Sequence, residues 1–288
     1  GREIASTPDM RFWFLQDNGQ RQIQLVVSGR DADAVTHAAA EITSQAKRIP
    51  LIENVVSTAE LDRLCHDFIV SHGAVPAPLN YRGFTRSICT SVNHVVCHGI
   101  PGPKPLREGD ILNIDVTLIF DGWHGDTSRM YFAGEPKVKA RRLVETTREA
   151  LYAGIAAVKP GASLRDVGRA IQTIAERAGF SVVRDFCGHG VGRIFHDAPN
   201  VVHYAEYRDR FGTHHAPDIE LRPGMFFTVE PMINEGKPDV KVLKDGWTAV
   251  TRDKSLSAQF EHSVGVTETG VEIFTKSPAG LDRPPYAV

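Results

Sequence analysis

The two halves of the chain carry the same helix signals at the same spacing. Ser57 opens the stretch Ser-Thr-Ala-Glu, a capping box, and an apolar helical stripe follows it as far as Gly73. Ser163 and Gly179 bound a second such stripe, and each follows its counterpart by 106 residues (163 − 57 and 179 − 73). We therefore expect two helices, at about 57–73 and 163–179, in related positions of the fold.

A Leu-Arg-x-Gly turn also recurs, at residues 106–109 and 221–224. A carboxylate, Asp115 or Glu230, lies nine residues after each leucine (115 − 106 and 230 − 221). This second offset is 115 residues, so the second half holds nine extra residues, and the polar segment 207–215 is the expected insertion. The repeated helix signals and the repeated Leu-Arg-x-Gly turns together predict a duplicated α+β fold with a site at the seam between its halves. Coincidence stays open, because capped helices are common.

Composition narrows the class of protein. The chain has 288 residues, 42% of them hydrophobic, and a net charge of -2, which is typical of a soluble globular protein without a nucleic-acid or membrane partner. No apolar run approaches the ~20 residues that a bilayer crossing needs, and we recognise no signal peptide. The four cysteines match neither a zinc motif nor a disulfide framework, so we expect free thiols and a cytoplasmic protein.

The first fifty residues differ in pattern from the rest. Short strands are expected at 10–15 and 22–28, and an alanine-rich helix at 31–47. None of these segments carries recognisable chemistry. We therefore divide the chain into an N-terminal extension of uncertain role, residues 1–50, and a single domain, residues 51–288.

Two aspartates are predicted to meet on one face of a hairpin. The stretch 111–119 alternates polar and apolar residues, and Asp121-Gly122 is typical of a two-residue hairpin turn. That turn pairs Thr117 with Asp126 and sets Asp115 diagonally across from Asp126, with Cβ atoms up to ~7–8 Å apart. Carboxylates that close repel each other, and a multivalent cation between them removes the conflict.

Two further acids and three histidines are residues of the kinds that bind metal ions. Glu230 and Glu261 lie in strand-like runs, where unpaired buried carboxylates are costly. His189 lies in a predicted glycine-rich loop, Cys-Gly-His-Gly-Val-Gly, and His196 follows seven residues later. The chain lacks the phosphate-loop and serine-hydrolase motifs. One histidine with four carboxylates suits a pair of Mn, Fe, Co or Zn ions better than a structural zinc. His98 lies in a separate Cys-His-Gly segment.

A set of six stretches carries a resemblance to a known family. They are Val-Val-Cys-His-Gly-Ile-Pro (95–101), Asn-Ile-Asp-Val-Thr (113–117), His-Gly-Asp-Thr-Ser (124–128), Cys-Gly-His-Gly-Val-Gly (187–192), Phe-Thr-Val-Glu-Pro-Met (227–232) and Ser-Ala-Gln-Phe-Glu-His (257–262). From about 57 to 275 the chain resembles type I bacterial methionine aminopeptidases. The resemblance implies the α+β pita-bread fold, in which pseudo-twofold halves build a curved antiparallel sheet flanked by helices.

The resemblance also implies an activity and a ligand set. The activity is removal of the N-terminal methionine from nascent polypeptides by a hydroxide activated between two divalent ions (Co, Mn, Fe, Zn or Ni). The implied catalytic residues are His98, which contacts the scissile amide nitrogen, His196, which steadies the oxyanion, and Glu230, the general base. The implied metal ligands are Asp115, Asp126, His189, Glu230 and Glu261, with Asp126 and Glu261 bridging the ions.

Other implied roles concern the substrate and a further cation. Residues that match the methionine pocket are Tyr81, Phe84, Cys89, Phe195, Met232 and Trp247. Residues that match a monovalent-cation site of some members are Asn113, Val116 and Ser257. Departures occur at Pro78, where some members have cysteine, and at Arg82, where some have histidine; both bear on substrate entry. The implied substrates have a small second residue. We also expect the protein to be a monomer and to contact the ribosome transiently.

Two alternatives remain within the same fold. An X-Pro aminopeptidase usually carries a large extra N-terminal domain, for which fifty residues are too few. A catalytically inactive binding protein would have lost metal ligands, whereas this sequence retains all five.

Overall fold

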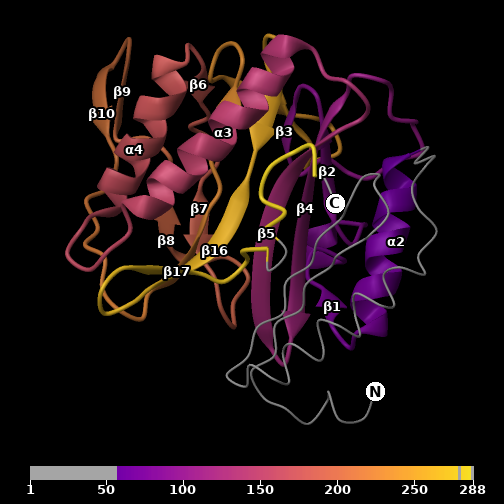
Figure 1. The fold of residues 1–288 in the computed structure, drawn as a ribbon, viewed down its shortest axis with the longest axis horizontal. Coiled ribbons are helices and arrows are strands. Elements are labelled where there is room, and N and C mark those ends of the chain that lie inside the picture. The colour runs from indigo at the N-terminus through magenta and orange to yellow at the C-terminus, as the bar shows by residue number, and fades with distance from the viewer. Residues whose placement is uncertain (1–56, 278–279, 287–288) are drawn as a thin grey trace.

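The computed structural model describes residues 57–277 and 280–286, and a large antiparallel sheet runs through the middle of this part (Figure 1). Nine strands form it. In spatial order seven of them are β1 (Val75–Pro76), β4 (Ile111–Phe120), β5 (Trp123–Phe132), β16 (Glu261–Val266), β11 (Phe226–Val229), β7 (Gly188–Gly190) and β8 (Asp197–Val201). The other two are β2 (Cys89–Val92), which pairs with β4, and β17 (Val271–Ile273), which pairs with β16.

Three small sheets complete the β structure of the described residues. Their strands are β6 (Ser181–Val182), β12 (Met232–Asn234) and β15 (Ser257–Gln259) in one, β3 (Val95–Cys97), β13 (Val240–Val242) and β14 (Ala249–Thr251) in another, and β9 (Glu206–Asp209) and β10 (Gly212–His215) in the third. The β9–β10 hairpin occupies the segment 207–215 that the duplication marks as inserted.

The helices of the described part are α2 (Thr58–Ser71), α3 (Val138–Ala156) and α4 (Leu164–Arg177), with a short 3₁₀ turn, η2 (Tyr81–Gly83). No helix in the described ranges has the length and apolar character that a membrane crossing requires. The predicted strands 10–15 and 22–28 and the helix 31–47 lie outside the described residues, so the division at residue 50 stays a prediction.

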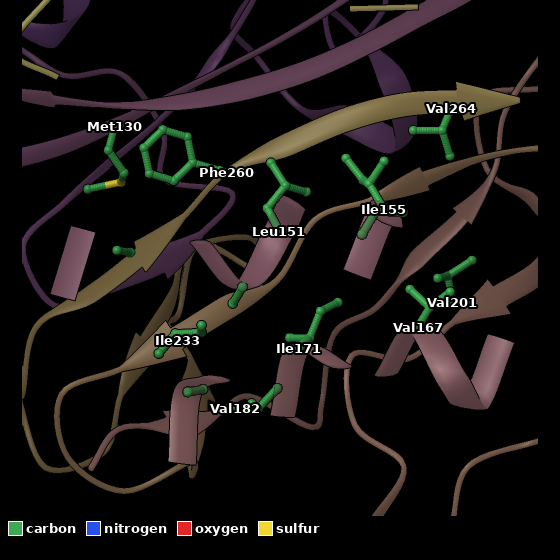
Figure 2. Close-up of a cluster of buried hydrophobic side chains, with 14 of the residues drawn as sticks. Met130, Leu151, Ile155, Val167, Ile171, Val182, Val201, Ile233, Phe260 and Val264 are labelled. Atoms are coloured by element: carbon green, nitrogen blue, oxygen red, sulfur yellow. The ribbon is translucent and has the colours of Figure 1, made fainter. Parts of the chain in front are cut away.

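The apolar core lies between the helices and one face of the sheet. Figure 2 shows Leu151 and Ile155 of α3 and Ile171 of α4 in the same buried cluster as Val264 of β16. The first half has its own cluster, in which α2 packs against β4 through side chains such as Val116. Each such fully buried aliphatic side chain contributes about 1.5–3 kcal/mol by leaving water. These contacts fix one face of each central strand toward the helices and turn the other face away from them.

The predicted duplication is visible in the connections that begin each half. Ser57 caps α2 and Ser163 caps α4, and the two helices have the same length of 14 residues. Ser57 forms an isolated antiparallel bridge with Pro105, and Ser163 forms the equivalent bridge with Glu220. Each bridge partner stands directly before the leucine of a Leu-Arg-x-Gly turn. The halves therefore repeat tertiary contacts as well as sequence signals.

The two caps differ in one detail. At Ser163 both hydrogen bonds of the capping box are present, including the return bond from the Ser163 N–H to Asp166. At Ser57 the side chain accepts from the N–H of Glu60 at 3.4 Å, but Glu60 is exposed and the described contacts hold no return bond. The capping box predicted at Ser57 is therefore only half formed.

Candidate active site

The β4–β5 hairpin sets the first two acids on one face of the sheet. Its turn residues Asp121 and Gly122 have φ angles of 49° and 76°, as the predicted Asp-Gly turn requires. Thr117 lies opposite Asp126 and Asp115 opposite Ser128, which confirms the predicted register. On the other side of β5, Ser128 pairs with Glu261 of β16, and this pairing carries the row of side chains on to a third acid.

Glu230 and His189 reach the same face from the second half. Glu230 follows directly after β11, where Thr228 pairs with Ser263 of β16. His189 is the central residue of β7, so the prediction of a loop at this position is wrong. The flanking glycines explain the strand, because a Cβ on Gly188 would lie 2.4 Å from the Thr228 carbonyl oxygen. The backbone can approach β11 only without that atom.

The His189 imidazole directs one nitrogen at the acids. Its Nδ1 lies 3.0 Å from the Gly190 carbonyl oxygen, which can only accept, so Nδ1 carries a proton and Nε2 is the nitrogen that can offer a lone pair. Nε2 lies 3.6 Å from both Asp126 Oδ2 and Glu230 Oε1, too far for a hydrogen bond. A histidine whose Nδ1 donates to a carbonyl group and whose Nε2 faces carboxylates at this distance is typical of histidines that bind metals.

A positive charge near the buried acids would favour their ionised form. Single ligand atoms of Asp126, His189 and Glu261 lie within 4.8 Å of one another. Burial raises the pKa of Asp115, Glu230 and Glu261 well above the usual range, and the charge of Asp126 raises each of them further. Burial raises the pKa of Asp126 as well. The Asp115 Oδ1 atom is buried and has no hydrogen-bond partner among the described residues. Oxygen and imidazole donors of this kind fit divalent metal ions.

Neighbouring side chains hold these acids in place. Thr117 donates its hydroxyl to Asp126 Oδ1 at 2.7 Å. Thr228 donates to Glu230 Oε1 at 2.8 Å and accepts from the His189 N–H at 3.0 Å, so one hydroxyl positions two of the candidate ligands. The period-2 alternation of a strand could have identified both threonines, because each shares a face with an acid two residues away or directly opposite.

Two further contacts of Glu230 involve residues that the sequence analysis did not select. Gln259 donates from Nε2 to Glu230 Oε2 at 3.2 Å, and it is the last residue of β15, two positions before Glu261 begins β16. His203 accepts from the Glu230 N–H at 3.1 Å, and burial lowers the pKa of His203 to about 3. No local signal marks His203, which stands alone in an ordinary stretch of sequence.

Both candidate catalytic histidines lie near His189. The His196 ring centroid is 4.3 Å from that of His189, and His196 Nδ1 lies 3.0 Å from the Tyr81 hydroxyl. His98 has a left-handed backbone with φ of 55°, which is uncommon outside glycine, although histidine adopts it more often than most residues. Burial and the nearby His189 lower the pKa of His98 to about 4. The imidazole of His98 is therefore neutral at pH 7.

The residues matched to a methionine pocket fall into separate contact groups. The Tyr81 ring is 4.9 Å from Phe195, beside His196. The Phe84 ring makes an edge contact with Trp247 at 5.2 Å, and Trp247 lies 6.1 Å from His98. One group therefore contacts His196 and the other contacts His98, which are the two candidate catalytic histidines.

Cys89 and Met232 complete that set. Cys89 is buried directly opposite Asp115, on β2. Met232 is 1% exposed and belongs to a small apolar cluster with Cys97, a residue that the sequence analysis did not select. Glu230 and Asp115 lie close enough to Cys97 to raise its pKa beyond the effect of burial. All four cysteines are free thiols, as predicted.

The three residues matched to a monovalent-cation site lie on different surfaces. Asn113 donates from its amide nitrogen to the Gln259 carbonyl oxygen at 2.8 Å. Ser257 is buried in β15 and donates its hydroxyl to Ile233. Val116 belongs to the cluster that faces α2, on the other side of β4 from Asn113. Such a cation site stays a prediction.

Comparison with known proteins agrees with this geometry. Residues 30–268 match the model of metallopeptidase family M24. The methionine aminopeptidase of Rickettsia prowazekii is 60% identical over 80% of this chain and 86% of that protein. The methionine aminopeptidase of Escherichia coli K12 is 52% identical over 78% of this chain and 83% of its own length.

The fold is also similar to that of a solved structure. The crystal structure of the Rickettsia prowazekii methionine aminopeptidase matches with a TM-score of 0.72 and 58% identity, over 77% of this chain and 86% of that one. This likeness confirms the α+β pita-bread class predicted from the sequence. The chain belongs to metallopeptidase family M24 and, within it, to the methionine aminopeptidases.

Proposed function

We propose that this protein hydrolyses the first peptide bond of polypeptides that begin with methionine and so releases the methionine. The observation that carries the proposal is the convergence of Asp126, His189 and Glu261 within 4.8 Å, in a chain 60% identical to a methionine aminopeptidase. A metal site at this place would explain why the sheet keeps four acids in its interior.

Two divalent ions are the proposed cofactors, drawn from Co, Mn, Fe, Zn and Ni. Asp126 and Glu261 would be ligands of both ions, and both side chains are nearly fully buried in the middle of the sheet. Asp115 would hold one ion, and His189 with Glu230 the other. When bound, such ions lower the pKa of water and polarise a carbonyl group.

The remaining steps belong to the protein's own side chains. Glu230 would carry the proton taken from water, with its two oxygens oriented by Thr228 and Gln259. His98 would contact the nitrogen of the scissile amide. His196, oriented by the Tyr81 hydroxyl, would donate to the oxygen on which negative charge develops.

The substrate side chain is proposed to lie among aromatic and sulfur groups. Tyr81, Phe195, Phe84, Trp247 and Cys89 present the polarisable surfaces that suit a flexible thioether. Met232 would support this surface from the buried cluster behind it.

Further proposals concern the biological setting. The preferred substrates are nascent polypeptides with a small second residue, and the protein works as a cytoplasmic monomer that meets the ribosome transiently. The N-terminal segment 1–50 is a separate extension of the domain 51–288. Asn113, Val116 and Ser257 mark the region where a monovalent cation would bind.

A peptide assay with defined metal loading tests the function. The chelated protein is reloaded with Co or Mn and incubated with Met-Ala, Met-Arg and Ala-Pro peptides. We expect metal-dependent release of methionine from Met-Ala, at a much lower rate from Met-Arg, and no cleavage of Ala-Pro. Preferential cleavage of Ala-Pro would identify the X-Pro alternative. Metal binding without cleavage of any peptide would identify an inactive binding protein.

A further inference from the structure

Arg82 has a backbone conformation that an arginine rarely adopts. It is the middle residue of η2, with φ of 46° and ψ of 32°, and it is exposed. The left-handed region costs a residue with a Cβ roughly 1–2 kcal/mol. Strain of this size persists where the surrounding structure imposes it, and it is concentrated at functional sites.

A short chain of ring contacts connects Arg82 with the candidate metal ligands. The guanidinium carbon of Arg82 lies 5.3 Å from the centre of the Tyr81 ring. The Tyr81 ring lies 5.2 Å from that of His196, which in turn lies 4.3 Å from that of His189. An extended peptide covers about 3.5 Å per residue, so four residues together with the reach of the last side chain are enough to cover this path.

The charge of Arg82 is not neutralised by any ion pair recorded within residues 57–277 and 280–286. The next arginine, Arg86, lies 3.9 Å from the Asp62 carboxylate, so the same segment does hold a charge pair. His196 is exposed, and the Arg82 guanidinium lies over the Tyr81 ring that contacts the His196 ring. A positive charge that a substrate can approach therefore lies near His196.

We propose that Arg82 is a specificity-determining residue that binds an acidic side chain at the third or fourth position of the polypeptide substrate. The inference rests on the proposed function, because it assumes that the first peptide bond lies beside His189. The second residue is next to that bond, so the following residues are the first that can reach η2. A guanidinium pairs with a carboxylate through two parallel hydrogen bonds, which favours aspartate and glutamate over their amides.

Matched peptides test the preference directly. We compare kcat/KM for Met-Ala-Glu-Ala-Ala, Met-Ala-Gln-Ala-Ala and Met-Ala-Lys-Ala-Ala, and for the same three side chains at position four. At one of the two positions we expect the glutamate peptide to exceed the glutamine peptide by about two- to fivefold at low salt, the range of an exposed ion pair. The lysine peptide should be slowest, and the preference should decline as salt screens the charges.

Variants assign the preference to one side chain. Arg82→Gln should bring the glutamate-to-glutamine ratio to about one, whereas Arg82→Lys should keep part of it. The control is Arg177→Gln, which makes the same charge change at an exposed position of α4, on the helix side of the sheet. It should keep the full ratio. A ratio of one in the unaltered protein, or a ratio that survives Arg82→Gln, overturns the inference. Failure of every peptide to release methionine would instead overturn the proposed function.

Discussion

The Nε2 atom of His189 and the Oδ2 atom of Asp126 face each other at 3.6 Å without a hydrogen bond. The His189 side chain comes from β7 and the Asp126 side chain from β5, so the contact joins the two halves of the duplicated fold. The predicted seam between the halves is thus also the place where imidazole and carboxylate donors meet. A cation there would stabilise acids whose pKa values burial has raised.

Replacing Asp126 should remove metal binding and turnover together. Asp126→Asn keeps the shape of the side chain but removes the charge that would bridge both ions. Calorimetric titration with Mn and a Met-Ala assay on the same sample measure the two effects. The control is Asp121→Asn, an equal charge change in the hairpin turn, where asparagine also tolerates positive φ. Full activity of Asp126→Asn at low metal concentration would refute the bridging role.

Replacing His98 should separate catalysis from metal binding. The imidazole of His98 is not among the candidate ligands, so His98→Ala should leave the calorimetric metal affinity unchanged. Turnover of Met-Ala should fall by about 10²-fold or more, the usual scale for one catalytic group. Unchanged kcat and KM would show that His98 has no part in the reaction.

Thr117 is expected to act through Asp126. Thr117→Val removes the 2.7 Å hydrogen bond to Asp126 Oδ1 while keeping the volume of the side chain. Loss of such a supporting contact typically weakens metal affinity by about 10–100-fold. Thr117→Ser restores the hydroxyl and should recover the affinity. If the valine variant lowers the unfolding temperature but binds metal as tightly as before, Thr117 is only a structural residue.

Alanine substitutions at Gly190 and Gly192 test whether β7 and β8 approach each other too closely for a side chain. A Cβ on Gly190 would lie 2.2 Å from the Ala198 carbonyl oxygen, whereas one on Gly192 would come no closer than 3.7 Å to Trp123. Gly190→Ala should therefore lower the free energy of unfolding by about 1–3 kcal/mol, the cost of overpacking. Gly192→Ala should change it little. Urea denaturation of both variants decides the matter, and equal stabilities would contradict the packing argument.

The strain at Arg82 makes a prediction about stability. Arg82→Gly removes the Cβ that disfavours the left-handed backbone, although glycine also has more conformational freedom to lose on folding. The balance should raise the free energy of unfolding by about 0.5–1 kcal/mol. The midpoint of urea denaturation measures it. A clear destabilisation would mean that the contact with Tyr81 outweighs the strain.

Sequence patterns were sufficient where the structural cause is local. The Asp121-Gly122 turn and the alternation of β4 fixed the partners of Asp115 and Asp126, because a two-residue turn leaves a single register. The helix caps at Ser57 and Ser163 were predictable for the same reason.

Contacts between distant segments could not be derived from local patterns. The ends of the Tyr81–His196 hydrogen bond are 115 residues apart, and no spacing rule connects them. The strand β7 was missed because its glycines have no strand propensity, and it exists only through pairing with β11 and β8. Residue type and strand pattern grouped the four acids with a histidine, but the choice of His189 and the role of each of the five ligands came from resemblance to a family.

Metal stoichiometry measured alongside activity is the most direct test of the central claim. Chelated protein is titrated anaerobically with Mn or Co, and bound metal and methionine release from Met-Ala are recorded at each step. We expect no activity without metal, activity that rises as metal binds, and two ions per chain at saturation. Full activity in protein that contains no metal would contradict the account.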